Sequence, residues 1–162
     1  MVNLFLKEKT LKANNKSFKY IEKGEGNLVL LVHGWPESCH SWLHQIFFIS
    51  NLGFKVVAIN VRGYAGSISP RSIKSYKLKL FIEDIIDIIN YFKRENAILI
   101  GHDWGAPICW TTAAYYKKKI TAVIGLSVPF TKRGKISSTK LWQKLYKNIF
   151  FYQNYFQYEN IP

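Results

Sequence analysis

Short apolar runs, separated by stretches of mixed polarity, dominate the first 130 residues of the chain. The runs cover residues 28–32, 54–59, 97–100 and 120–126. Runs of this length are typical of strands that are buried on both faces of a parallel sheet. Apolar residues recur at helical spacing between them, in residues 39–51, 75–93 and 105 to about 118. The alternation of strands and helices predicts an α/β fold with a mostly parallel, doubly wound sheet.

A hairpin and an amphipathic helix complete the predicted elements. Residues 3–10 and 16–23 are the expected hairpin strands, with the turn at Asn14-Asn15, because asparagine tolerates the left-handed backbone conformation. In the helix at 75–93 we expect one face to point inward and the acidic residues to lie elsewhere. The inward residues are Leu80, Ile85, Ile88 and Phe92, and the acidic ones are Glu83, Asp84 and Asp87.

The first candidate for chemistry is the sequence Gly101-His102-Asp103-Trp104-Gly105, between a predicted strand and a predicted helix. This is the context of a nucleophile elbow, usually written G-x-S-x-G, in which glycines relieve the crowding of a strained turn. Asp103 holds the place of the nucleophile. A carboxylate can attack an electrophilic carbon, such as that of an epoxide or an alkyl halide, and form a covalent ester. The alternative is a tight turn in which Asp103 only caps the helix.

A second motif, His33-Gly34-Trp35-Pro36, follows the first apolar run. Glycine lets the backbone approach a ligand closely, and Pro36 permits a cis peptide bond. Such a turn can direct the Trp35 N–H at an oxyanion, with the N–H of Trp104 as the second donor. The alternative is a structural turn capped by one of the serines that follow. Both motifs fall at the carboxyl ends of predicted parallel strands, where ligands bind in such folds, and this favours a shared site.

Charge and cysteine content narrow the classes of function. The net charge is +13, from 23 Lys and Arg against 10 Asp and Glu. The positive residues are scattered and no recognition motif accompanies them, so we predict no nucleic-acid binding. The two cysteines, Cys39 and Cys109, show neither metal-ligand spacing nor a disulfide framework. The N-terminus lacks the apolar core of a signal peptide and no run is long enough to span a membrane, so a soluble, cytoplasmic protein without membrane partners is expected.

The residues after 130 have a different character. Residues 131–147 are basic and polar, a helix is predicted near 139–148, and residues 150–157 form an aromatic run with interleaved glutamine. Such a run suits a cap over an apolar pocket, although simple helix packing is the alternative. We therefore divide the chain into 1–130, the N-terminal part of a catalytic core, and 131–162, the start of a helical lid.

Taken together, these motifs resemble those of the epoxide hydrolases of the α/β-hydrolase fold. The matching sequences, in the family's order and spacing, are H-G-W-P-E-S with Trp42, R-G-Y-x-x-S-x-x-P from Arg62, G-H-D-W-G-A from Gly101 and S-V-P-F from Ser127. The resemblance implies that Asp103 is the nucleophile that opens the epoxide. It also implies that Trp35 and Trp104 supply the oxyanion-hole amides, and that His33, Gly34, Pro36, Gly101, His102 and Gly105 support the two turns.

The aromatic run resembles the lid segment that bears the first of two tyrosines that bind the epoxide oxygen. This implies an acid role for Tyr152 and places Phe150 and Gln153 beside the substrate. A phenol suits the role because its unperturbed pKa of about 10 keeps it protonated at neutral pH. The implied substrates are a small apolar epoxide and water, and the chemistry requires no metal, nucleotide or flavin.

The sequence also departs from the family pattern. Ala65 stands where the family usually has a second glycine. The family's second lid tyrosine, its acidic residue and its water-activating histidine have no counterpart in these 162 residues. We therefore expect the N-terminal portion of an epoxide hydrolase, able to form the ester but unable to release the diol without a complementing C-terminal half.

Other functions are compatible with the same motifs. Haloalkane dehalogenases also have an elbow aspartate followed by tryptophan, but they tend to carry asparagine where this chain has Trp35. Trp35 and Tyr152 favour the epoxide interpretation. A non-catalytic relic, or a ligand-binding module, is the alternative from another functional class.

Overall fold

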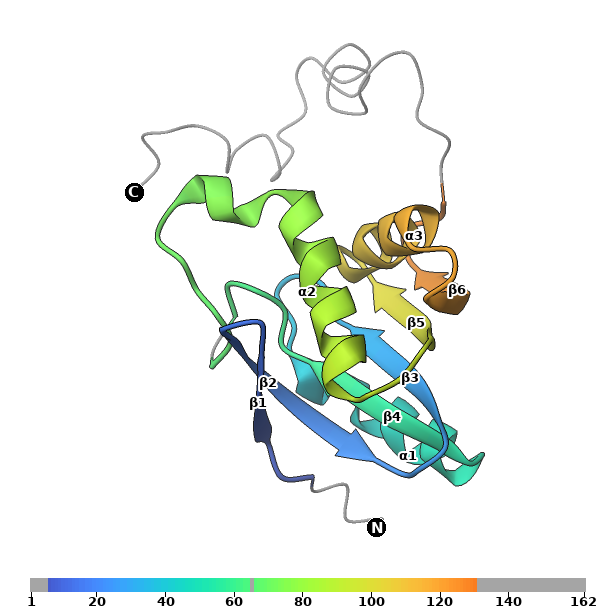
Figure 1. Cartoon of the computed structure of the whole chain (residues 1–162). Helices are drawn as coiled ribbons and strands as arrows, with labels where there is room; N and C mark the ends of the chain where they lie inside the picture. The colour runs from blue at the N-terminus through green and yellow to red at the C-terminus, as the bar shows by residue number, and fades with distance from the viewer. Residues whose placement is uncertain (1–5, 65, 131–162) are drawn as a thin grey trace, which may run out of the picture. The chain divides into compact units, whose positions relative to one another are not determined.

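A six-stranded sheet forms the centre of the protein in the computed structural model (Figure 1). The structure describes residues 6–64 and 66–130, which belong to one compact unit. The strands are β1 Lys9–Ala13, β2 Lys16–Lys23, β3 Asn27–Val32, β4 Phe54–Ile59, β5 Ala97–His102 and β6 Ile120–Leu126. Their order across the sheet is β1-β2-β4-β3-β5-β6.

The sheet is mostly parallel, as the apolar runs predict. Strands β4, β3, β5 and β6 are parallel neighbours, whereas β1 and β2 pair antiparallel to each other and β2 pairs antiparallel to β4. Strand β3 lies at the centre, and residues 28–32 are almost completely buried. Both faces of this strand are covered by helices, which explains why it is apolar at every one of these positions.

Alternate residues of β3 belong to two separate hydrophobic cores. The helices are α1 Leu43–Asn51, α2 Leu78–Tyr91 and α3 Gly105–Tyr115, with 3-10 turns η1 Cys39–Trp42 and η2 Ile73–Tyr76. Leu28 and Leu30 pack with residues of α2 and α3, whereas Val29 and Leu31 pack with residues of η1 and α1. Figure 1 shows α2 in front of the strands and α1 behind them. The sheet is therefore covered on both faces, as a doubly wound fold requires.

The predicted first strand at 3–10 is wrong in its position. Strand β1 covers Lys9–Ala13 and ends directly at the turn, with Leu11 and Ala13 buried. Asn14 and Asn15 have positive φ values of 48° and 60°, as predicted for the turn. A two-residue turn requires the strands to pair immediately on either side of it. The strand must therefore include residues 11–13, which lie outside the predicted range.

The helices are shorter than the apolar periodicity indicates. Residues 39–42 form a 3-10 turn, and α1 proper begins at Leu43. The extended backbone of Lys77 delays the start of α2, and Lys93, with φ of 54°, lies beyond its end. Helix α3 ends at Tyr115 and not near residue 118. In the part of the chain that the structure describes, no helix has the length and apolar character needed to span a lipid bilayer.

The expectation that Asp84 lies away from the core is also wrong. Asp84 is only 3% exposed, and its carboxylate accepts two hydrogen bonds of 2.8 Å from the Arg62 guanidinium. Lys16 Nζ donates a further 2.7 Å hydrogen bond to the same carboxylate. A buried carboxylate is tolerated when charged donors satisfy it. Asp84 thus connects α2 to β2 and to the loop after β4, which contains the R-G-Y motif.

Candidate functional site

Two turns lie side by side where β3 and β5 end. These strands are parallel neighbours, with Val32 opposite Gly101. After β3 the chain places β4 on one side, and it then places β5 on the other. Such a reversal makes the carboxyl ends of β3 and β5 the topological switch point, where open α/β sheets bind their ligands. The H-G-W-P and G-H-D-W-G turns are both at this point.

The backbone of Asp103 is unusual for a residue with a side chain. Its φ is 49°, in the left-handed region that favours glycine. The tight turn is closed by a 3.0 Å hydrogen bond from the Ala106 N–H to the Asp103 carbonyl. Strained backbone of this kind occurs preferentially at functional sites. The strand, sharp turn and helix around Asp103 match the geometry of a nucleophile elbow.

Steric crowding explains why glycine flanks Asp103 on both sides. A Cβ at Gly101 would overlap the carbonyl group of Gly105, and a Cβ at Gly105 would overlap the carbonyl oxygen of Val32. These obstacles are backbone atoms and cannot move aside. The two glycines therefore let α3 start directly against the ends of β3 and β5.

The turn after β3 places a backbone donor on Asp103. The Trp35 N–H donates a 2.9 Å hydrogen bond to Asp103 Oδ1, and the Trp35–Pro36 peptide bond is cis. A Cβ at Gly34 would overlap the Cβ and Oδ1 of Asp103. Glycine at this position is thus what lets the two turns come close enough for the hydrogen bond to form.

A second carboxylate, which the motif analysis did not single out, lies beside the elbow. Glu37 Oε2 is 2.9 Å from Nδ1 of His102, the residue before Asp103. The same oxygen accepts a longer hydrogen bond, 3.4 Å, from the Gly34 N–H. Glu37 therefore links the two turns by contacting one group from each. The only sequence signal for it is its place in H-G-W-P-E-S.

His33 is a buried structural residue of the site. Its Nδ1 is 2.7 Å from the Gly34 carbonyl oxygen, and its Nε2 accepts a 3.1 Å hydrogen bond from the Val61 N–H. Burial lowers the pKa of His33, so the ring is neutral at neutral pH. The ring of Tyr64 packs edge-on against it, with 4.6 Å between centroids. Burial, and next the charges of Asp103 and Glu37, raise the pKa of the Tyr64 phenol.

The predicted residues of the two turns are thus brought together. Trp104 follows Asp103 directly at the start of α3, and the side chains of Trp35 and Trp104 are each half exposed. The predicted lid residues, Tyr152, Phe150 and Gln153, lie outside the described residues.

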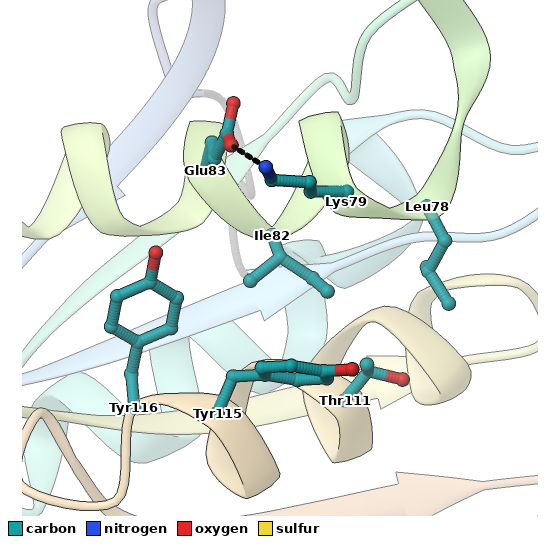
Figure 2. A pocket seen from close by; sticks show the side chains of 7 residues that line it. All are labelled: Leu78, Lys79, Ile82, Glu83, Thr111, Tyr115 and Tyr116. Carbon is teal, nitrogen blue, oxygen red and sulfur yellow. Dashed lines mark ion pairs between the residues drawn. The ribbon is translucent and has the colours of Figure 1, made fainter.

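A pocket of about 260 Å³ lies apart from this site, between α2 and α3 (Figure 2). It is lined by Leu78, Lys79, Ile82, Glu83, Thr111, Tyr115 and Tyr116. Its α3 residues come from the end of the helix opposite to Asp103. An ion pair of 3.8 Å between Lys79 and Glu83 lies at its edge. The pocket is therefore not formed by the residues of the two turns.

Comparison with known proteins identifies the fold. The family described as alpha/beta hydrolase fold matches residues 27–160. The chain belongs to the α/β-hydrolase fold family. The predicted fold class is thereby confirmed.

Several proteins similar to this α/β hydrolase are named epoxide hydrolases. Epoxide hydrolase B of Mycobacterium tuberculosis is 44% identical over 112 residues, which are 69% of this chain and 32% of that protein. Epoxide hydrolase A of the same organism is 34% identical over 152 residues, which are 93% of this chain and 47% of that protein. The crystal structure of epoxide hydrolase A from Mycobacterium thermoresistibile has a TM-score of 0.91 at 36% identity, covering 97% of this chain and 50% of that one. The chain thus spans about a third to a half of the length of these relatives.

Proposed function

We propose that Asp103 opens epoxides by forming a covalent ester, the first half of the conversion of an epoxide to a diol. The observation that carries the proposal is the 2.9 Å hydrogen bond from the Trp35 N–H to Asp103 Oδ1. It holds one carboxylate oxygen in place and leaves Oδ2 as the oxygen that can attack. The similarity to proteins named epoxide hydrolases supports an epoxide as the electrophile.

In the proposed step, Asp103 Oδ2 attacks a ring carbon of the epoxide. The carbon–oxygen bond of the ring breaks, its electron pair goes to the ring oxygen, and a proton donor neutralises the developing alkoxide. Oδ1 becomes the carbonyl oxygen of the ester. It is then already within hydrogen-bond distance of the Trp35 N–H, one donor of an oxyanion hole, and we assign the second donor to the Trp104 N–H.

We further propose that residues 131–162 begin the cap of the site and that Tyr152 is the proton donor. This assignment rests on the resemblance of the aromatic run to the lid segment of the family. A phenol remains protonated at neutral pH, because its unperturbed pKa is about 10. In this proposal Phe150 and Gln153 border an apolar epoxide.

Hydrolysis of the ester requires a base that activates water. The chain has four histidines, His33, His40, His44 and His102. Both ring nitrogens of His33 have backbone partners, and Nδ1 of His102 faces Glu37. We assign the base to none of the four, so the activity proposed for these 162 residues is ester formation alone.

The test is to capture the ester. The full chain is incubated with an apolar aryl epoxide and its mass is measured intact and after proteolysis. The expected result is a gain of one epoxide mass on the peptide that contains Asp103. Asp103→Asn should show no gain, and Glu83→Gln, a change to a surface carboxylate on α2, should react like the parent.

Two outcomes would contradict the proposal. Absence of an adduct on Asp103, with the chain folded, would exclude nucleophilic function of this site. Release of halide from haloalkanes, with epoxides inert, would instead support a dehalogenase, the family in which an elbow aspartate is also followed by tryptophan.

A further inference from the structure

Glu8, Cys39 and His40 form a cluster outside the catalytic turns. Each offers one ligand atom, and these atoms lie within 4.8 Å of one another. Cys39 and His40 belong to η1, whereas Glu8 precedes β1. Cys39 is completely buried, and the side chains of His40 and Glu8 are 46% and 38% exposed. The cluster is thus a surface site with a thiol at its base.

One nitrogen atom lies at the centre of this cluster. Nδ1 of His40 is 3.7 Å from the Cys39 Sγ and 3.7 Å from Glu8 Oε1. It can accept a hydrogen bond from the thiol, or it can donate one to the carboxylate when it carries a proton. It cannot do both at once. The three groups, by contrast, can all donate lone pairs at the same time to one cation.

The atom types and the two distances from His40 Nδ1 fit zinc. Zinc binds thiolate sulfur at about 2.3 Å, and imidazole nitrogen and carboxylate oxygen at about 2.0 to 2.2 Å, usually in a tetrahedron. These bond lengths require neighbouring ligand atoms to be about 3.4 to 3.6 Å apart. The two separations of 3.7 Å that involve His40 Nδ1 need to shorten by only a few tenths of an ångström. The third pair, Cys39 Sγ and the Glu8 carboxylate oxygen, lies within 4.8 Å, and the partly exposed Glu8 side chain can move to close it. A mixed S, N and O set suits borderline metals such as zinc better than magnesium or calcium.

Two of the three ligand residues, Cys39 and His40, are held in place by their backbones. The Cys39 N–H donates a 2.7 Å hydrogen bond to Asn60 Oδ1, and the His40 N–H donates a 3.3 Å hydrogen bond to Ser38 Oγ. Ser38 and Ser41 cap η1 reciprocally. The Cys39 and His40 side chains therefore project from a fixed turn, which lowers the entropy cost of binding an ion.

We propose that Glu8, Cys39 and His40 bind a zinc ion, with water completing the tetrahedron. Zinc binding replaces the proton of the Cys39 thiol by a sulfur–zinc bond and releases that proton to solvent. The ion would connect the segment ahead of β1 to the turn that follows the H-G-W-P motif.

Lys19 is the competitor for this site. Its Nζ is 3.9 Å from Glu8 Oε2, so a bound cation must share the Glu8 carboxylate with it. A partly exposed ion pair of this kind contributes up to about 1 kcal/mol. Lys19→Ala should therefore tighten zinc binding by about two- to fivefold, an effect that a non-specific thiol–metal contact would not show.

The test is a cobalt titration of the reduced, metal-free full chain. Cobalt replaces zinc in sites of this type and gives an intense near-ultraviolet absorption when a thiolate is a ligand. The expected result is this absorption at saturation with one ion per chain, reversed by added zinc. Cys39→Ser should abolish it. His40→Asn and Glu8→Gln should each weaken binding at least about tenfold.

Matched controls come from the same chain. Cys109 is also a buried free thiol, and His44 is an exposed histidine on the neighbouring helix α1. Cys109→Ser and His44→Asn should leave the titration unchanged. If Cys39→Ser fails to fold, the exposed His40 and Glu8 variants decide the question. Absence of the thiolate absorption from the parent chain would overturn the proposal. So would an absorption that is lost in Cys109→Ser and retained in Cys39→Ser.

Discussion

The contact between Gly34 and Asp103 brings the two turns of the site together. A methyl group at position 34 would occupy the space of the Asp103 Cβ and Oδ1. We predict that Gly34→Ala reduces the rate of ester formation by about a hundredfold or more, because displacements of about 1 Å have such effects. It should also lower the free energy of unfolding by about 1 to 3 kcal/mol.

Gly53→Ala is the control for this prediction. Gly53 has φ of 85°, and a Cβ added there would have no other atom within 4 Å, so its replacement introduces backbone strain without a clash. This should cost about 1 to 2 kcal/mol of stability and leave ester formation intact. Equal loss of adduct in the two variants, measured by intact mass against time, would show that stability and not site geometry is responsible.

Glu37 contacts both turns of the site, His102 Nδ1 at 2.9 Å and the Gly34 N–H by a longer hydrogen bond. A glutamine can accept only through its amide oxygen and carries no charge. We predict that Glu37→Gln slows ester formation by roughly tenfold and leaves the fold unchanged. This is a smaller effect than the roughly hundredfold loss of rate expected for a displacement of about 1 Å. Rapid-quench measurement of the adduct tests this, and an unchanged rate would reduce Glu37 to a structural role.

At the scale of elements, the charged anchor of α2 is the feature with the largest expected effect on stability. Asp84 is 3% exposed and pairs with Arg62 and Lys16. Removing one partner of a buried pair leaves the other charge without compensation. Asp84→Ala should therefore lower the free energy of unfolding by about 3 to 5 kcal/mol.

The neighbouring Glu83 provides the comparison for Asp84. It pairs with Lys79 across 3.8 Å at the surface of the same helix, where such pairs contribute less than about 0.5 kcal/mol. Urea unfolding of Glu83→Ala should match the parent. Similar losses for the two alanine variants would mean that helix propensity, and not the buried pair, determines the effect.

The elements also differ in how far the sequence predicts them. The bounds of β4 and β6 follow from runs that are mostly apolar. In β4 the run reflects burial of its last four residues, whereas most side chains of β6 are exposed or only partly buried in the described unit. The ends of α2 do not follow from the sequence in this way, since the extended Lys77 and the left-handed Lys93 interrupt a periodicity that continues past them. The helical pattern alone places Asp84 on the wrong face, because its partner Arg62 comes from a different element.

The same reasoning applies to the candidate site. The two turns are predictable because each motif is local and both follow strands of one parallel sheet. The Glu37–His102 contact joins residues 65 positions apart, and Glu8 is likewise remote in sequence from Cys39 and His40. No spacing rule connects such pairs, so only the folded chain shows them.

At the scale of the whole described unit, β6 is the strand whose side chains are least covered. Among the described residues it pairs with β5 alone, and Ile124 and Leu126 are 48% and 42% exposed. Apolar edge strands promote association between chains. We predict that Ile124→Lys slows aggregation of the purified chain several-fold, measured by light scattering.

Thr121→Lys adds the same charge to an exposed position of β6 without removing an apolar side chain. It should slow aggregation less than Ile124→Lys does. Equal effects would attribute the change to net charge, which opposes association in general, and not to the apolar edge.

The hydrogen bond from the Trp35 N–H to Asp103 also makes this amide a spectroscopic reporter. Before reaction, the acceptor of this hydrogen bond is a charged carboxylate oxygen. After reaction, it would be the carbonyl oxygen of a neutral ester. Hydrogen bonds to charged acceptors are stronger than those to neutral ones. In ¹⁵N-labelled protein the Trp35 amide proton should therefore resonate far downfield and move upfield as the ester accumulates. A single backbone signal would then report the chemical state of the Asp103 carboxylate in solution, with no chromophore or added label near the site.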